Sequence, residues 1–339
     1  MGAWRRARST TALWKGSPIE RLRPWHATAR LAPWTRHAKR HRVTTSPPAS
    51  PPAAVTAPIA QLAPAVIAAT AFAVVDILIR WGFEAGADSL TMVMVRGLIG
   101  VPLLYAWIRF GVRPKPMTPR EKWISLGFGV LFAGNVYLLF VAIEAMPVPA
   151  AILTYFVYPL LTGLIGAATR LDTLTWRGLT AALAAFLGLG LMLGAHPGGL
   201  ALIGILAGLG AAACRTTTLI LTRAMLPGAD ARLITWYSLI SSTVLFCLVA
   251  LATGTWNPPQ TGFGWACLVG IGVFVTVGLL GVFMSTMRIG PFRTALFMNL
   301  EPLLATIGAA LFLGEVITPL QALGGAVMIA ALVVFQLRR

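Results

Sequence analysis

Four charged residues lie well inside long apolar stretches of the chain: Asp76, Arg96, Arg215 and Glu301. If such a stretch crosses a membrane, a charge near its middle costs roughly 2.5–3.5 kcal/mol on insertion scales, so it needs a partner or a water-filled cavity. A carboxylate can bind an ammonium group or a proton, and a guanidinium offers two parallel donors to a carboxylate or a phosphate. These residue types therefore predict the binding of a small charged solute.

Structural roles stay open for the same charges. Asp76 and Arg80 are four residues apart, which places them on one face of a helix, where they can form a local ion pair. Arg96 can instead pair between helices with Asp76 or Glu301. Each of these pairs would satisfy the charges without any solute.

Polar residues accompany two of these charges. Glu301 precedes Pro302, whose nitrogen cannot donate to the carbonyl of Met298, and Asn299 lies beside them. A carboxyl group next to an interrupted helix suits proton coupling or substrate contact, and the alternative is a kink beside a buried, protonated Glu. Arg215 is followed by three threonines, which can bond to the backbone of their own helix and bend it, although plain packing explains them equally well.

Two further stretches carry polar side chains that can line a cavity and orient a small solute, or pack between helices. One contains Asn135 and Tyr137, and the other contains Thr154, Tyr155 and Tyr158 before Pro159. We predict a substrate-binding or coupling site composed of Asp76, Arg96, Asn135, Tyr137, Tyr158, Arg215, Asn299 and Glu301.

Residues for an enzyme active site are scarce. After residue 60 the chain contains one histidine, His196, and no cluster of His, Cys and acidic residues with the spacing of a metal site. The three cysteines lie in apolar stretches, which is typical of small core residues. We expect no catalytic residues, no metal and no cofactor.

The composition indicates where these residues are held. Of the 339 residues, 57% are hydrophobic and only 11% are charged, which excludes an ordinary soluble protein. The formal net charge of +17 is divided unevenly. Residues 1–60 hold 11 of the 27 Lys and Arg residues and one of the 10 acidic residues, a net +10, and the rest of the chain holds +7. The charge therefore belongs largely to an extension and gives no support for nucleic-acid binding.

From Leu62 onward the chain divides into apolar runs of about 20 residues, the length that crosses a bilayer as a helix. We predict ten such spans, over residues 62–81, 89–109, 123–143, 149–169, 174–194, 199–222, 233–253, 264–287, 292–313 and 318–337. Alternate connections carry the basic residues: Arg109, Arg113, Lys115, Arg120, Lys122, Arg170, Arg177, Arg223, Arg232, Arg288 and Arg293, with Arg338 and Arg339 at the end. The positive-inside rule then predicts that both termini are cytoplasmic.

The two halves of this body resemble each other. At an offset of 143 residues, Met146–Leu161 aligns with Ile289–Leu304, and Asp172 aligns with Glu315. Weak similarity at a fixed register over five spans indicates a duplication. Because five is odd, the second copy must be inverted, as in many secondary transporters, where the substrate site lies near the midplane between repeats.

In these features the body resembles the EamA-like type of the drug/metabolite transporter superfamily. The resemblance rests on Arg96 in the second span, the Met146-Pro-Val-Pro turn before Tyr158-Pro159, Glu301-Pro302, and Gly314-Glu315-Val-Ile-Thr318 before Gly324. One departure is Arg170-Leu-Asp172 in the first half, where the second half has Leu313-Gly-Glu315. The resemblance implies ten helices around a central cavity and the movement of small metabolites, often outward.

We therefore predict an all-α membrane protein of ten transmembrane helices in two inverted five-helix repeats. Residues 61–196 and 197–339 are the repeats, and residues 1–60 are a basic, Pro-rich, disordered extension. That extension is interpreted as a cytoplasmic tail, an organellar transit peptide, or the product of a start site placed too far upstream.

The predicted function is transport of small metabolites, such as amino acids or related zwitterions, by an exporter that works by alternating access. The alternatives are efflux of apolar drugs and a non-transporting membrane receptor or scaffold. The expected partners are a small-molecule substrate, the lipid bilayer and a coupling proton or ion, with no nucleic acid, and the oligomeric state stays open. The expected location is the bacterial inner membrane, with a plastid membrane as the alternative.

Overall fold

The computed structural model describes residues 59–194 and 200–337. The chain divides into two units, residues 1–51 and 52–339, and every described residue belongs to the second unit. The predictions for residues 1–58, for His196 and for Arg338 and Arg339 therefore lie outside the described residues.

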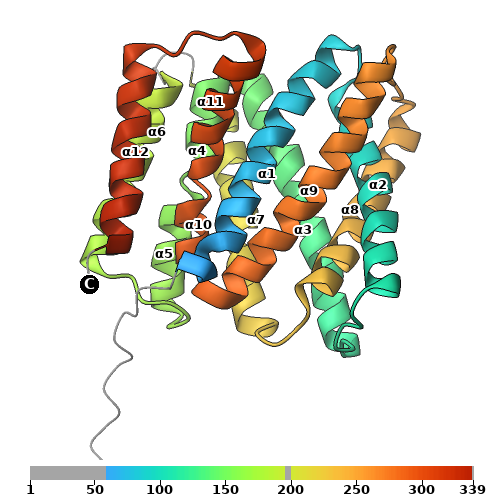
Figure 1. Ribbon diagram of the computed structural model, residues 1–339, viewed down its shortest axis with the longest axis horizontal. Coiled ribbons are helices and arrows are strands. Elements are labelled where there is room, and N and C mark those ends of the chain that lie inside the picture. The colour runs from blue at the N-terminus through green and yellow to red at the C-terminus, as the bar shows by residue number, and fades with distance from the viewer. Residues whose placement is uncertain (1–58, 195–199, 338–339) are drawn as a thin grey trace, which may run out of the picture. The chain divides into compact units, whose positions relative to one another are not determined.

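The described residues are helical throughout, apart from their connections, and contain no strand (Figure 1). The helices are α1 (Ile59–Glu84), α2 (Ser89–Phe110), α3 (Pro119–Ala145), α4 (Val148–Tyr155), α5 (Tyr158–Ala168), α6 (Trp176–Leu193), α7 (Leu202–Met225), α8 (Ala231–Thr253), α9 (Gly262–Ile289), α10 (Pro291–Phe297), α11 (Leu300–Leu313) and α12 (Pro319–Leu337). They make ten segments long and apolar enough to cross a membrane, because α4 with α5 and α10 with α11 each form one interrupted segment. The predicted ten spans are confirmed, with ends that differ by a few residues.

The helices begin and end at residues suited to those positions. Six of them begin after a side chain that accepts a hydrogen bond from the first turn, as N-caps do: Asp88, Thr118, Thr175, Asp230, Thr261 and Thr318. Three of the helices, α6, α8 and α11, end at a C-cap glycine in the left-handed region, Gly194, Gly254 and Gly314. Local sequence thus sets the length of each span.

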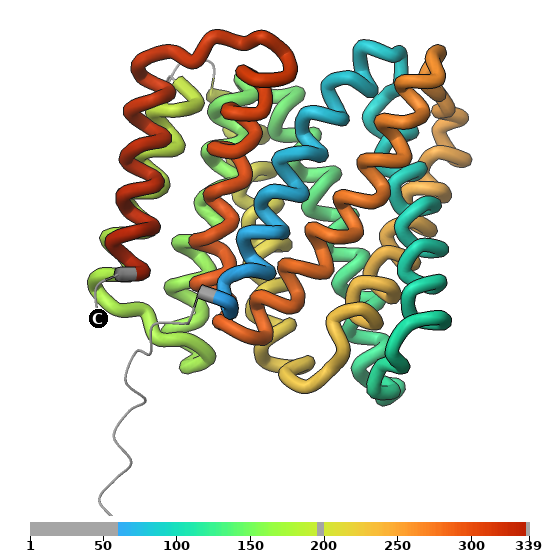
Figure 2. Tube along the Cα trace, viewed as in Figure 1, coloured from blue at the N-terminus to red at the C-terminus, as the bar shows by residue number. Residues whose placement is uncertain are grey.

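The two halves of the body pack in a way that repeats on exchange of the halves. Helix α1 packs along α9, and its counterpart α7 packs along α3; likewise α3 contacts α8, as α9 contacts α2. Helices α2 and α8, and α6 and α12, contact their own counterparts. The start of α1 and the end of α12 lie at the same end of the bundle (Figure 2). This exchange of partners is expected for two inverted five-helix repeats.

One end of the bundle holds the α2–α3, α5–α6, α7–α8 and α9–α10 connections (Figure 1). We call it the basic end, because it carries the basic residues predicted to lie in alternate connections. The other end, which holds the α1–α2 connection, we call the opposite end.

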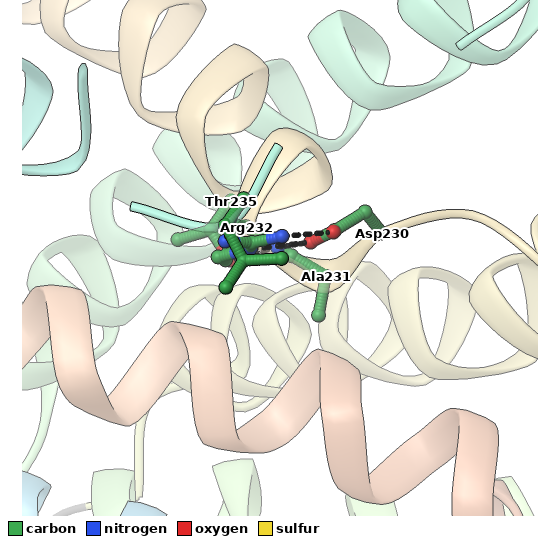
Figure 3. A network of polar contacts seen from close by, with 5 residues as sticks. Asp230, Ala231, Arg232 and Thr235 are labelled. Atoms are coloured by element: carbon green, nitrogen blue, oxygen red, sulfur yellow. Dashed lines mark hydrogen bonds and ion pairs between the residues drawn. The ribbon is translucent and has the colours of Figure 1, made fainter. Parts of the chain in front are cut away.

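Hydrogen bonds at equivalent positions join the second span of each repeat to the other repeat. At the opposite end, the N–H of Asn257 donates to Thr91 Oγ1 at 3.0 Å. At the basic end, Arg232 folds back onto Asp230 with two donors at 3.0 and 2.6 Å (Figure 3), and its Nη1 donates to the carbonyl of Val112 at 2.8 Å. Burial raises the pKa of Asp230, but the donors of Arg232 lower it by more, so the pKa lies below its usual value.

The interrupted spans are equivalent positions of the two repeats. Helix α4 gives way to α5 at Phe156 and Val157, and α10 gives way to α11 at Met298 and Asn299, within one residue of the offset of 143. In each case a proline follows the break, Pro159 two residues after Val157 and Pro302 three residues after Asn299, and removes one helical hydrogen bond. Both breaks lie midway along the bundle (Figure 1).

The contact of α6 with α12 depends on glycine. A Cβ atom added at Gly188 would lie 2.6 Å from the carbonyl oxygen of Gly324, which is closer than two such atoms can approach. A Cβ atom at Gly127 on α3 would meet nothing within 4 Å. Helices α6 and α12 therefore approach each other more closely at Gly188 and Gly324 than side chains at these positions would allow.

We expect Gly188→Ala to destabilise the protein by about 1–3 kcal/mol through overpacking. Gly127→Ala is the matched control, and it should be neutral or stabilising by roughly 0.5–1 kcal/mol because Ala favours the helix. Thermal unfolding in detergent measures both. Equal unfolding temperatures for the two variants would show that the α6–α12 contact does not need a glycine there.

Candidate binding cavity

A cavity of about 420 Å³ lies between α1, α2, α3, α4, α9 and α11. Its wall is largely apolar, and the polar lining residues are Asp76, Ser89, Arg96, Tyr155 and Glu301. A second cavity of about 150 Å³ shares Asp76, Arg96, Tyr155 and Glu301 with the first, and it adds Asn135 from α3 and Arg215 from α7. The two cavities are adjacent, and the charged residues that they share line the inner part of the site.

All four intramembrane charges predicted from the sequence meet in this inner part. Asp76 comes from α1, Arg96 from α2, Arg215 from α7 and Glu301 from α11, so both repeats contribute one acid and one base. Asn135 also lines it, while its Nδ2 donates to the carbonyl of Ala211 at 2.8 Å and ties α3 to α7.

The ion pairs considered as structural alternatives are not formed in the described part of the chain. Arg80 pairs with Glu315 and not with Asp76, and both partners are half exposed. A second ion pair joins Asp230 and Arg232, which are not cavity residues. Asp76, Arg96 and Glu301 therefore face the cavity without an ion-pair partner from the described chain.

Aromatic rings hold the two buried guanidinium groups. The Arg96 guanidinium lies 5.0 Å from the ring centre of Phe132 and 5.9 Å from that of Phe246. The Arg215 guanidinium lies 5.9 Å from the rings of Phe72 and of Tyr158. Such contacts offset part of the cost of burying the cation.

Each of these arginines keeps an unused donor. Arg96 Nη2 and Arg215 Nε are buried and have no hydrogen-bond partner in the described part of the chain. A buried donor without an acceptor costs about 1–3 kcal/mol or more when charged. An anionic group placed in the cavity can remove that cost.

Three predicted site residues lie elsewhere. Tyr137 is 65% exposed on the outer face of α3, and Tyr158 is 1% exposed and packs beneath Arg215. Asn299 is buried, and its Nδ2 donates to the carbonyl of Leu296 at 2.9 Å. None of the three lines either cavity.

Helix geometry explains part of this outcome. Asn135 and Tyr137 are two residues apart and so point to nearly opposite sides of a helix, which means that only one of them can face a cavity. The rings of Phe132 and Phe246 lie beside Arg96. The sequence does not predict these contacts, because an aromatic residue in an apolar span does not indicate which side chain it will contact. Tyr155 was named among the polar residues but was left out of the predicted site.

The interruption before Pro302 is partly repaired. The carbonyl of Met298 accepts from the N–H of Glu301 at 3.0 Å, so a tighter turn replaces the missing bond. Helix α7 stays continuous through Arg215, with Thr218 Oγ1 bonded to the carbonyl of Cys214 at 2.9 Å. Thr216 reaches across to the carbonyl of Tyr158 instead, at 3.3 Å.

The cavity extends toward the opposite end of the bundle and is closed toward the basic end. Phe83 and Ser89, which flank the α1–α2 connection, line it, as does Ile143 near the end of α3. Toward the basic end, the rings of Phe128 and Phe283 stack at 5.8 Å within a buried apolar cluster. The lining of the cavity thus reaches toward the opposite end, whereas buried apolar packing lies toward the basic end.

The architecture is that of a ten-span helical membrane protein with two five-helix repeats around a central cavity. The model of the EamA-like transporter family matches residues 61–194 and again residues 202–336. The chain belongs to this family, and it is a multi-pass membrane protein with the fold of a transporter. The predicted family and fold class are thereby confirmed.

Several solved structures match this chain. One of them, a crystal structure of a protein, does so with a TM-score of 0.66 and 20% sequence identity. The match covers 80% of this chain and 96% of that chain. At this identity the likeness shows the fold alone. The comparison with curated proteins found no match.

The cavity can be mapped by cysteine labelling in a background without Cys214, Cys247 and Cys267. We expect Ile79→Cys, which lines both cavities, to react with a water-soluble maleimide. Ile77→Cys is the control on the same helix, because Ile77 is buried and packs against Gly308. If both cysteines react at the same rate, the cavity is not water-filled.

Proposed function

We propose that this protein is a secondary transporter of small metabolites that carry both charges, such as amino acids or related zwitterions. The observation that supports it is the meeting of two buried guanidinium groups with unused donors and two carboxyl groups in one cavity. A solute with a carboxylate and an ammonium group satisfies both kinds of charge at once.

The dimensions and the wall of the cavity support a small solute. A volume of about 420 Å³ is at the low end of the roughly 300–1,000 Å³ typical of small-molecule pockets. The carboxylate would accept from Arg96 or Arg215, and the ammonium group would bind Asp76 or Glu301. The apolar wall formed by residues such as Phe140 and Ile152 would contact the rest of the solute.

Alternating access is the mechanism that the repeats support. Each repeat contributes one acid and one base to the site, so a rocking of one repeat against the other exposes the same charges to either end. No nucleotide-binding segment is found in the sequence, so the driving force must be a gradient. Asp76 and Glu301 are the groups proposed to carry a coupling proton.

We propose export as the direction and the bacterial inner membrane as the location, with a plastid membrane as the alternative. Export follows the outward transport common in the family that the sequence resembles. Basic residues such as Arg113 and Lys115 at one end of the bundle support a cytoplasmic position for that end. The cavity would then open to the outside.

Efflux of apolar drugs is the second candidate, and the largely apolar wall of the larger cavity favours it. For such a solute the aromatic and aliphatic wall would matter more than the charges. A receptor or scaffold role differs from both, since it predicts no flux of any solute from proteoliposomes.

Replacement of the site charges separates the two transport hypotheses. We expect Arg96→Ala and Glu301→Gln each to weaken amino-acid transport by about 10- to 100-fold, since a hydrogen bond to a charged group contributes about 1.5–3 kcal/mol. Comparison of extracellular metabolites from overexpressing and deletion cells first selects the candidate amino acids. The flux of these amino acids, radiolabelled, is then measured in proteoliposomes.

Tyr137→Phe is the matched control, because Tyr137 faces away from the cavity and should transport like the parent. If Arg96→Ala and Glu301→Gln also transport like the parent at equal protein levels, the assignment of the site is wrong. Retained efflux of an apolar dye with no amino-acid flux would favour the drug hypothesis.

A further inference from the structure

Asp172 links the two repeats at the basic end of the bundle. It lies in the α5–α6 connection of the first repeat, and its Oδ2 accepts from the N–H of Phe292 in the first turn of α10 at 3.1 Å. Its Oδ1 accepts from the N–H of Thr173 at 2.9 Å. The free amide donors of a helix start are natural partners for a carboxylate.

The connection that carries Asp172 is shaped by a strained turn. The N–H groups of Leu171 and Asp172 both donate to the carbonyl of Gly166, at 3.0 and 3.1 Å. Arg170 has a φ of 56°, a value that non-glycine residues rarely adopt. This turn is the place where the first repeat has Arg170-Leu-Asp172 and the second has Leu313-Gly-Glu315.

The backbone of the second repeat is fitted to the carboxyl group. Gly290, just before α10, has a φ of 91°, and a Cβ atom there would lie 2.7 Å from Asp172 Oδ2. Only glycine combines this conformation with this space. The ring of Phe292 packs against Gly163 of α5 and Gly178 of α6, so the start of α10 is wedged between them.

The charge of Asp172 indicates a contact that can be broken. Burial raises the pKa of this carboxyl, and the N–H groups of Phe292 and Thr173 with the nearby charges of Arg293 and Arg223 offset the rise only in part. Because the pKa of Asp172 lies above its usual value, ionisation of this carboxyl disfavours the folded state instead of stabilising it. Such a contact is suited to break and form again during a transport cycle.

Among the described residues, the equivalent positions at the opposite end form no such contact. At the offset of 143, Glu315 corresponds to Asp172, but Phe292 corresponds to Pro149, which has no N–H to donate. Glu315 pairs instead with Arg80, through side chains that are 54% and 44% exposed. An exposed pair of this kind contributes little. Different contacts therefore join the two repeats at the two ends of the bundle.

We propose that Asp172 is a latch that holds the basic end closed and so favours the conformer whose cavity opens to the opposite end. The proposal rests on the alternating access proposed above. Opening the basic end requires α10 to move away from the α5–α6 connection, which breaks the bond from Phe292. Asp172 lines neither cavity, so it acts as a positioning residue and does not touch the solute.

The test is a pair of thiol reporters in nanodiscs, where a maleimide reaches both ends. In the cysteine-free background, Thr218→Cys reports the basic side of Arg215, and Ser89→Cys reports the opposite end. We expect Asp172→Ala to raise the labelling rate of Thr218→Cys about tenfold, which corresponds to about 1.4 kcal/mol, without raising that of Ser89→Cys. Asp172→Asn, which keeps an acceptor oxygen, should give a smaller rise.

Gly290→Ala is a second route to the same state, since its methyl group displaces the carboxyl, and Glu315→Ala is the matched control at the opposite end. We expect Gly290→Ala to act like Asp172→Ala, and Glu315→Ala to leave the Thr218→Cys rate unchanged. The latch is disproved if neither Asp172→Ala nor Gly290→Ala changes that rate, or if both reporters accelerate together, which indicates general loosening. No solute is needed, so a parent protein without flux would overturn the proposed transport and not this result.

Discussion

Water is absent from the hydrocarbon core of a membrane, and the rest of the structure follows from that absence. Backbone amides must be paired within each segment, so every described span is a helix, and even the interrupted turn at Met298 finds a substitute donor in Glu301. A charged side chain in the hydrocarbon core needs an aromatic ring beside it, an ion-pair partner or a water-filled cavity. Arg96 and Arg215 have rings and a cavity, with donors left over.

Duplication places these costly groups efficiently. Each repeat contributes one carboxyl and one guanidinium, and the exchange of helix partners brings them to one cavity in the middle of the bundle. The contacts at the two ends of the bundle differ between the repeats. A partly buried carboxyl bonded to a backbone N–H lies at the basic end, whereas an exposed ion pair lies at the other. One proline, Pro149, explains why the first arrangement cannot be copied at the second end.

Particular residues show how far the sequence reasoning extended. Asp76, Arg96, Arg215 and Glu301 were found because a charge in an apolar run has few acceptable surroundings. Tyr137 and Asn299 line neither cavity, which their residue types did not indicate, because a tyrosine or an asparagine is tolerated at a lipid-facing or buried position alike. Helix spacing allowed a pair of Arg80 with Asp76 as one alternative, but Arg80 pairs with Glu315, 235 residues away. Local spacing permits a contact and cannot rank it against distant ones.

The sequence by itself determined the ten spans, their duplication and the charges that had to be sheltered, because length, hydropathy and charge act locally and at fixed cost. Only the tertiary structure decided which of those charges stay unpaired, which end the cavity reaches and what Asp172 contacts. These outcomes depend on distances between helices far apart in the chain. The packing of one repeat against the other sets those distances, and no segment encodes them alone.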